Sequence, residues 1–449
     1  MAPPPIALLA GLPTPVLVPA HGVGSRADLP LPFAALLIGA SLALVASFVA
    51  LGALWREPRL GPDDGLPLPS RLAALLDSRA LRGVAVTLSL LLTAWTLLAL
   101  VAGRDDANNP VPYVVYVWLW VGLAALSLVL GPVWSVLNPV RWLHLGLTRV
   151  ARLDPDEALL SGDVGYWPAA IGLFAFAWLE LIAPDRTTLP VLRAAIGAFV
   201  LIDLLGALVK GRGWFATGDA FEVWSRLFGT MSPLGRRADN RWVLRTPLHG
   251  PSALAVRPGL TATAAVMLGG TAYDGLSGEP RWYSFAQSSP HPELVGTAGL
   301  LGVCALVGAA LHLAAAVSAR LADVPVRGCA RQFAPSLLPI AAGYVVAHYW
   351  SLFVLEGQNT LARLSDPLGT GANWLGTAHL TANAALIAPT LVATVQVVAI
   401  VTGHVLGVVL AHERAVTLFD RRVAVLGQLP LLVLMVGYTC GGLYLLFSS

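Results

Sequence analysis

Five ionisable side chains lie inside long apolar stretches of the sequence and are the first candidates for chemistry. They are Glu180, Asp203, His312, His348 and His404. Placing an ionisable group in the hydrocarbon region of a membrane costs free energy, so such groups are candidate sites for protons, ions or redox centres. A single histidine in a span can instead hydrogen-bond a neighbouring helix, and that structural role stays open for each one.

Asp203, His312 and His404 are expected to share one layer of the membrane. Each lies roughly 20–30 Å from the outer end of its own apolar run, at about 1.5 Å per helical residue. All three runs are predicted to cross the membrane inward. We interpret them as a candidate intramembrane polar site in the inner half, which favours a transporter.

His348 lies on a run of the opposite direction and nearer the outer surface. Tyr344 and Tyr349 flank it, and Glu356 follows two helical turns later. The outer loop beyond carries Asp366 and His379. These residues predict a second polar cluster that opens outward, where a metal would need two or three convergent ligands.

Common catalytic motifs are missing from the sequence. It has no GxxxxGK[ST] phosphate loop, no HExxH, no HxH pair and no GxSxG elbow. Its three cysteines, Cys304, Cys329 and Cys440, form no CxxC pair and predict no disulfide. The familiar hydrolytic and nucleotide-dependent chemistries are therefore not indicated by motif.

The elements that must position these residues are membrane-spanning helices. The chain has 449 residues, of which 56% are hydrophobic and 12% charged, whereas soluble domains carry about a quarter charged residues. Apolar runs long enough to span a membrane lie near 33–55, 83–103, 112–132, 165–183, 190–209, 258–275, 293–318, 333–355, 387–411 and 426–447. We predict an all-α polytopic integral membrane helix bundle of about ten transmembrane helices, with the glycine-rich sixth run the weakest.

Orientation follows from the distribution of basic residues. Most of the 28 lysines and arginines fall in alternate loops, and the opposite side keeps only Arg26, Arg104, Arg186, Arg193, Arg281 and Arg363. The positive-inside rule places the arginine-rich loops in the cytoplasm and both termini outside. A net charge of +3, spread over loops, predicts no nucleic-acid partner.

The chain is expected to consist of an N-terminal segment and one membrane domain. Residues 1–32 form an extracytoplasmic N-terminal segment, and residues 33–449 form the membrane domain. Residues 1–20 either remain attached or act as a signal peptide, whose removal after Ala20 leaves His21 as the new N-terminus. Residues 219–231 predict a cytoplasmic amphipathic helix lying in the membrane surface, with Asp219 as its cap.

Several segments together resemble a bacterial, actinobacterial-type polytopic membrane family that is often labelled fenitrothion hydrolase. They are Ala20-His-Gly-Val-Gly-Ser-Arg-Ala-Asp-Leu-Pro-Leu-Pro32, Phe333-Ala-Pro-Ser-Leu-Leu-Pro-Ile340, Ala347-His-Tyr349, Glu356-Gly-Gln358, Ser365-Asp-Pro-Leu-Gly369, Gly403-His404 through His412, and Gln428-Leu-Pro-Leu-Leu-Val-Leu-Met-Val-Gly-Tyr438. The resemblance spans most of the chain and implies a common fold in the bacterial cytoplasmic membrane.

The resemblance implies a membrane-bound organophosphate hydrolase that cleaves a phosphotriester with metal-activated water. The candidate ligands for copper or zinc are then His21, His348, Glu356 and His379. A cleaved N-terminal His21, which can chelate copper, supports a different class: a transporter or a metal-handling or redox membrane subunit. The bilayer, and in that second class a partner membrane subunit, are the expected partners.

Overall fold

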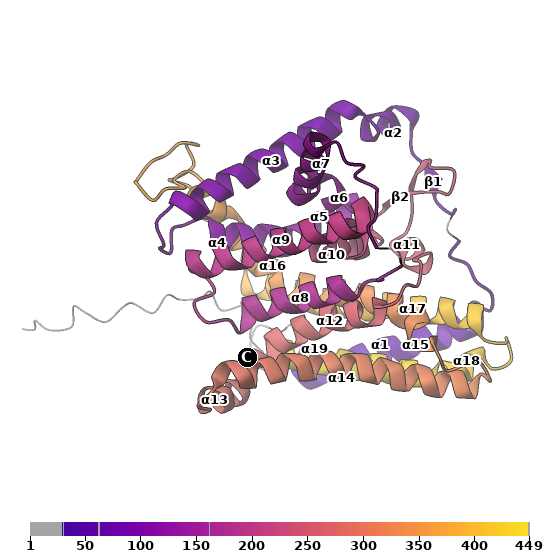
Figure 1. Cartoon of the computed structure of the whole chain (residues 1–449). Coiled ribbons are helices and arrows are strands. Elements are labelled where there is room, and N and C mark those ends of the chain that lie inside the picture. Colours follow the sequence, from indigo (N-terminus) through magenta and orange to yellow (C-terminus); the bar gives the residue numbers. More distant parts are fainter. Residues whose placement is uncertain (1–28, 30, 62, 161, 448–449) are drawn as a thin grey trace, which may run out of the picture.

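The computed structural model describes residue 29 and residues 31–61, 63–160 and 162–447, in which long helices run side by side (Figure 1). The long helices are α1 (Phe33–Leu54), α3 (Arg79–Ala102), α8 (Trp167–Leu181), α9 (Leu189–Lys210), α12 (Leu260–Ser277), α14 (Pro292–Leu321), α16 (Leu338–Arg363), α17 (Pro389–Leu418) and α19 (Leu429–Leu446). A further long helix is continuous through α4 (Val111–Tyr113), η2 (Val114–Gly122) and α5 (Leu123–Leu130).

The predicted fold class is confirmed: the chain is an all-α polytopic membrane helix bundle. Among the described residues, eight helical segments are long and apolar enough to cross a membrane. The other two predicted runs are also helical. They are α8, with 15 residues, and α12, with 18 residues. Most side chains of the glycine-containing α12 are buried among other helices, which explains its weak hydropathy signal.

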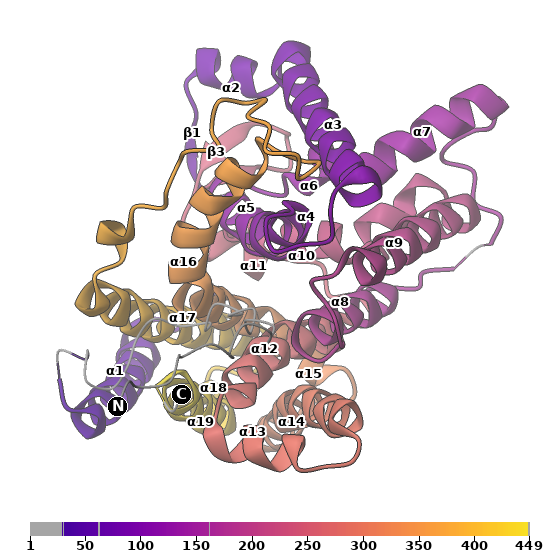
Figure 2. The same ribbon diagram turned by 90° about the vertical axis from the view of Figure 1, so that its left-hand side faces the viewer.

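The helices α8, α12 and α16 lie between two groups of helices (Figure 2). One group contains α1, α14, α17 and α19, and the other contains α3, α5, α9 and α10 (Ala220–Gly229). The helix α12 packs on α8, α14 and α16, and α16 packs on α17. More than half of the residues of α12 and α16 are buried among other helices.

The contact between α16 and α17 depends on small residues. A Cβ added at Gly343 would lie 2.5 Å from the carbonyl oxygen of Ala399, and one at Gly403 would lie 2.5 Å from that of Pro339. These distances leave no room for a side chain, so the two backbones meet at the two glycines. Close approach at small residues is a common source of helix association in membranes, where dispersion contacts replace the hydrophobic effect.

The segment η2 is a π-helix of nine residues inside an otherwise α-helical span. Such helices are rare and often mark functional sites. The segment packs on α16. Within this contact, Trp118 Nε1 donates a hydrogen bond to the carbonyl oxygen of Gly357 at 3.2 Å, and Gly122 lies against Phe353. The wider turn therefore lies against the helix that carries His348.

A small antiparallel sheet joins two of the arginine-rich loops. Its strands β1 (Leu66–Pro67), β2 (Leu234–Arg236) and β3 (Trp242–Leu244) have the order β1-β3-β2. Asp77, at the end of α2 (Ser70–Leu76), accepts a hydrogen bond from Trp242 Nε1 at 3.0 Å and forms an ion pair with Arg236. These two contacts lower the pKa of the Asp77 carboxyl.

Glu413 on α17 fixes the chain just after α1. Its carboxylate accepts hydrogen bonds from the backbone N–H groups of Arg59 and Leu60, at 2.9 and 2.8 Å, and from Trp55 Nε1 at 2.8 Å. A carboxylate with three donors is well satisfied although it is buried. The exit of the first span is therefore held by a late helix of the bundle.

The helix predicted at residues 219–231 does not lie on the membrane surface. Asp219 precedes α10 and caps it, accepting a hydrogen bond from the N–H of Glu222. Every residue of α10 except Arg226 is buried, because the helix is enclosed by α5 and α8. The apolar face inferred from the sequence thus packs against protein rather than lipid.

An exposed apolar stripe lies instead on α7 (Pro139–Ala151), which projects from the bundle in Figure 2. Its Leu143, Leu147 and Val150 are exposed, whereas its opposite face, with Val140, His144 and Thr148, is buried. The remaining short helices are α6 (Trp134–Leu137), η3 (Gly211–Ala216), α11 (His249–Ser252), α13 (Pro280–Gln287), α15 (Cys329–Phe333), η4 (Ala334–Leu337), η5 (Ala384–Ile387) and α18 (Ala424–Gly427).

Candidate functional site

Two acids, a histidine and a tyrosine come together between the central helices α8, α12 and α16. Asp274 lies in the last turn of α12, and its Oδ2 is 2.8 Å from Nε2 of His348 on α16. The same Oδ2 accepts a hydrogen bond from the hydroxyl of Tyr349 at 2.9 Å. Glu180, in the last turn of α8, lies close enough to interact electrostatically with Asp274. We call these four residues the outer cluster.

The outer cluster is removed from both water and lipid. The exposed fractions are 5% for Glu180, 5% for Asp274, 4% for His348 and 1% for Tyr349. Glu180 Oε1 has no hydrogen-bond partner among the described residues. Two buried carboxylates beside one imidazole cannot all be charged without a large desolvation cost. The cluster therefore holds protons in some of its states, and its charge depends on how many.

Helix geometry explains why these residues meet. The three helices α8, α12 and α16 are all predicted to run outward. Glu180 and Asp274 lie near the ends of the short helices α8 and α12, and the longer α16 extends past them. The cluster thus lies toward the predicted outer side. Arg186, in the loop after α8, attracts Glu180.

The π-helix η2 supplies the aromatic wall of the outer cluster. The hydroxyl of Tyr116 donates a hydrogen bond to the carbonyl oxygen of Arg186 at 2.8 Å. The indole of Trp120 lies next to Tyr349 and stacks on Trp224 of α10, with ring centroids 3.9 Å apart. The stacked pair of Trp120 and Trp224 therefore connects the outer cluster to α10.

The candidate metal ligands among the described residues do not converge. His348 is paired with Asp274, whereas Glu356 contacts Asn359 and Arg363 at 3.3 and 3.7 Å, and His379 is exposed in the loop after α16. His21 and the expected signal peptide lie outside the described residues. Within the described part of the chain, no three His, Cys, Asp or Glu side chains are grouped closely enough to hold a metal ion.

The expected layer of Asp203, His312 and His404 is not assembled either. Asp203 on α9 accepts a hydrogen bond from Trp214 Nε1 at 2.7 Å. His312 on α14 is exposed, and its Nδ1 contacts the carbonyl oxygen of its own helix at Gly308. His404 on α17 is buried and makes the equivalent contact to Ile400. Figure 2 shows α9 well apart from α14 and α17.

Asp274 is the functional candidate that sequence reasoning missed. It lies within the predicted run 258–275, whose glycines and low hydropathy drew attention away from its single carboxylate. A carboxylate in a weak span is itself a usable signal, because a central helix that is shielded from lipid tolerates polar residues. The sequence does identify His348 and the intramembrane Glu180.

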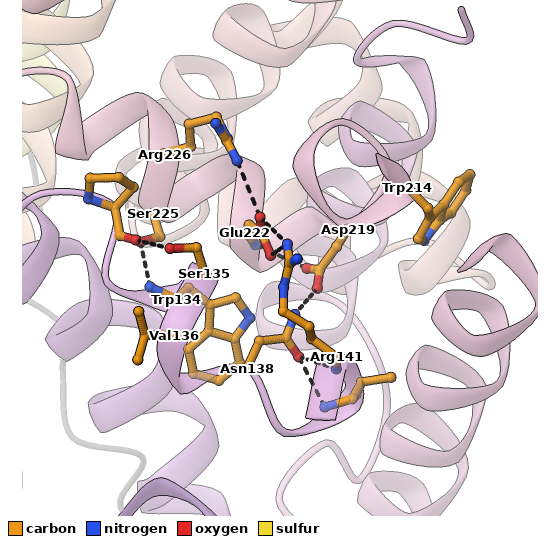
Figure 3. Close-up of polar contacts among 12 residues, drawn as sticks. Trp134, Ser135, Val136, Asn138, Arg141, Trp214, Asp219, Glu222, Ser225 and Arg226 are labelled. Atoms are coloured by element: carbon orange, nitrogen blue, oxygen red, sulfur yellow. Dashed lines mark hydrogen bonds and ion pairs between the residues drawn. The ribbon is translucent and has the colours of Figure 1, made fainter. Parts of the chain in front are cut away.

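A second buried network lies toward the arginine-rich side and is shown in Figure 3. Nη2 of Arg141 contacts both carboxylate oxygens of Glu222, at 2.5 and 2.6 Å, and Arg226 contacts Glu222 at 3.2 Å. Asn138 Nδ2 donates to Asp219 Oδ2 at 2.6 Å. The side chains come from α7, the residue before it, α10 and its cap, so the network ties these elements together.

Comparison with protein-family models, curated proteins and solved structures finds no match to this chain. The chemistry of the outer cluster therefore rests on its own geometry. A carboxylate held between an imidazole and a phenol, beside a second buried carboxyl, can take up, hold and release protons within the membrane.

Proposed function

We propose that this chain is a proton-coupled transporter of the bacterial cytoplasmic membrane. The observation that carries the proposal is the outer cluster, in which Glu180, Asp274 and His348 are buried together on three central helices. Buried ionisable groups in membrane helices are costly and serve most often as ion or proton sites. Protonation of Glu180 or Asp274 changes the charge of a dry site and so favours different packings of α8, α12 and α16.

The proposal is supported by the location of the cluster. It lies where three helices and a π-helix meet, and helix interfaces of this kind are common positions for substrate and coupling-ion sites in transporters. Arg186 lies in the loop after α8, at the predicted outer end of the site, and attracts Glu180. Protons would therefore enter from the outer side.

The experiment uses the proton itself as the probe. Purified protein in liposomes is adsorbed on a solid-supported membrane and exposed to a rapid pH step. Proton binding inside the membrane moves charge through the low-dielectric region and gives a transient current. We expect this current for the wild-type protein and a smaller current for Glu180→Gln and for Asp274→Asn, because neither amide can titrate.

Glu293→Gln is the matched control, because Glu293 is an exposed carboxylate at the start of α14 on the same predicted side. It should leave the current unchanged. A wild-type current no larger than that of protein-free membranes would overturn the proposal, as would equal currents from wild type, Glu180→Gln and Asp274→Asn.

A hydrolase is the second candidate, and the His348–Asp274 pair is the observation that favours it. A carboxylate 2.8 Å from an imidazole nitrogen orients the ring, as a general base requires. This reading agrees with the family resemblance. It predicts release of a nitrophenol from fenitrothion by the purified protein, and loss of that release in His348→Ala with Glu180→Gln unaffected.

A further inference from the structure

Three acids are buried together in the half of the bundle opposite the outer cluster. They are Asp203 on α9, Asp219 at the cap of α10 and Glu222 in its first turn, with exposed fractions of 2%, 0% and 0%. Asp203 interacts electrostatically with both of the others. Asp203 lies about 10 Å along α9 from Lys210, where the helix reaches the arginine-rich side. We call these three residues the inner acids.

The charges of this region do not balance. Glu222 is paired with Arg141 and Arg226. Asp219 has the neutral donors Asn138 and the N–H of Glu222, and among the described residues Asp203 has only the indole of Trp214, on Oδ1. Three carboxylates against two guanidinium groups leave one excess negative charge in a site shielded from water. Such a charge is neutralised by a proton or a bound cation.

The oxygens that remain free decide between a proton and a metal cation. Both oxygens of Asp219 and both of Glu222 already accept hydrogen bonds. The side-chain oxygen of Asn138 accepts from the backbone N–H groups of Val140 and Arg141. Oδ2 of Asp203 has no donor among the described residues. A metal cation of the oxygen-loving kind needs several ligands, whereas a proton needs one.

We propose that Asp203 is a second proton-binding site, in the predicted inner half of the bundle. The stacked pair of Trp120 and Trp224 lies between it and the outer cluster, because Trp120 is next to Tyr349 and Trp224 follows Glu222 on α10. Two buried indoles thus lie between the two proton sites. The use of both sites in transport rests on the proposed function, whereas the site at Asp203 does not.

Titration of Asp203 depends on the charged groups of every element packed nearby. Those groups are Arg82 on α3, Arg141 and His144 on α7, Lys210 at the end of α9, Arg212 on η3, and Asp219, Glu222 and Arg226 at α10. Glu222 is ion-paired with Arg141 and Arg226. The acids that interact electrostatically with Asp203 are Asp219 and Glu222.

The test is infrared difference spectroscopy of the full-length protein in lipid during a pH titration. A buried carboxylic acid gives a C=O stretching band that disappears when the acid ionises. We expect one such band to be lost in Asp203→Asn and to be retained in Asp420→Asn, an exposed acid on the same predicted side. Thermal unfolding of each variant, followed by circular dichroism, verifies that the fold is intact.

A second variant tests the same site without removing the acid. Trp214→Phe deletes the donor to Asp203 Oδ1, so the carboxylate loses a stabilising hydrogen bond. The band should then persist to a pH higher by about one to two units. A band whose titration is the same in wild type, Asp203→Asn and Trp214→Phe would overturn the proposal.

Recording the same titrations in a Glu180→Gln background distinguishes the signal of Asp203 from that of the outer cluster. Loss of the Asp203 band in that background supports the inner site whether or not the outer cluster moves protons. A signal that disappears in Glu180→Gln and is unaffected by Asp203→Asn refutes the inner site and leaves the proposed function intact.

Discussion

The buried pair of Arg141 and Glu222 is predicted to make a large contribution to stability. Side-chain exposure is 14% for Arg141 and 1% for Glu222, so Arg141→Ala leaves a dry carboxylate with one weaker partner. Removing one member of a buried ion pair costs about 3–5 kcal/mol. Arg226 remains 3.2 Å from Glu222, which places the expected loss at the lower end, about 3 kcal/mol.

A double-mutant cycle isolates this interaction. Arg141 also lies 4.8 Å above the ring of Phe215, so its truncation removes a cation–π contact as well. In the combined variant Arg141→Ala, Glu222→Gln, the uncompensated charge is absent, and the cost should fall below the sum of the single losses by about 2 kcal/mol. Arg226→Ala is the matched control, because its side chain is 36% exposed and lies 3.2 Å from Glu222, so its loss should cost less than that of Arg141.

The assay is equilibrium unfolding by denaturant in lipid–detergent micelles, read by circular dichroism. A shift in midpoint without a change in slope reports a change in the free energy of unfolding. The reasoning is refuted if Arg141→Ala costs no more than Arg226→Ala, or if the single losses simply add in the combined variant.

Two further predictions concern packing and pH. Gly403→Ala should lower the free energy of unfolding by about 1–3 kcal/mol, because its Cβ would lie 2.5 Å from the carbonyl oxygen of Pro339; Gly437→Ala, with open space around it, should cost nothing in the same unfolding assay. Burial, followed by the nearby charges of α7 and η3, lowers the pKa of His144 below its usual value, so the unfolded chain binds the proton more tightly. The contribution of neutral His144 to the free energy of unfolding should therefore be fully present above about pH 6.5. It should be lost as the pH drops through the folded-state pKa. A thermal-unfolding series from pH 8 to pH 5 should show a flatter profile for His144→Asn, and an unchanged profile would contradict the assignment.

The spans were predictable because hydrophobicity and length are local properties of the sequence. All ten predicted runs are helical, including the weak run 258–275, which forms the buried α12. The hydrophobic signal does not report which face of a span meets protein, because lipid and core are equally apolar. His312 illustrates this: its depth could be estimated from the sequence, but its exposed position on α14 could not.

The candidate site was only partly predictable for a related reason. His348 stands out as a polar residue in an apolar run, yet its partner Asp274 is 74 positions earlier along the chain, and nothing local links the two. For α10, the local feature was predictable and the tertiary contacts were not. Its cap follows from residue types, but its enclosure by α5 and α8 is a property of tertiary packing.

The bonds from Trp55 and the following backbone to Glu413 have a consequence for biosynthesis. Trp55 and Glu413 are 358 residues apart in sequence, and α1 packs on α17 and α19. At about 5–20 residues per second, a ribosome needs about 20–70 s to synthesise the partners of α1 after α1 itself has emerged. During that interval α1 lies in the bilayer without α17 and α19, which have not yet been synthesised. Chains that terminate before α17 would thus present an undocked α1 to membrane quality control.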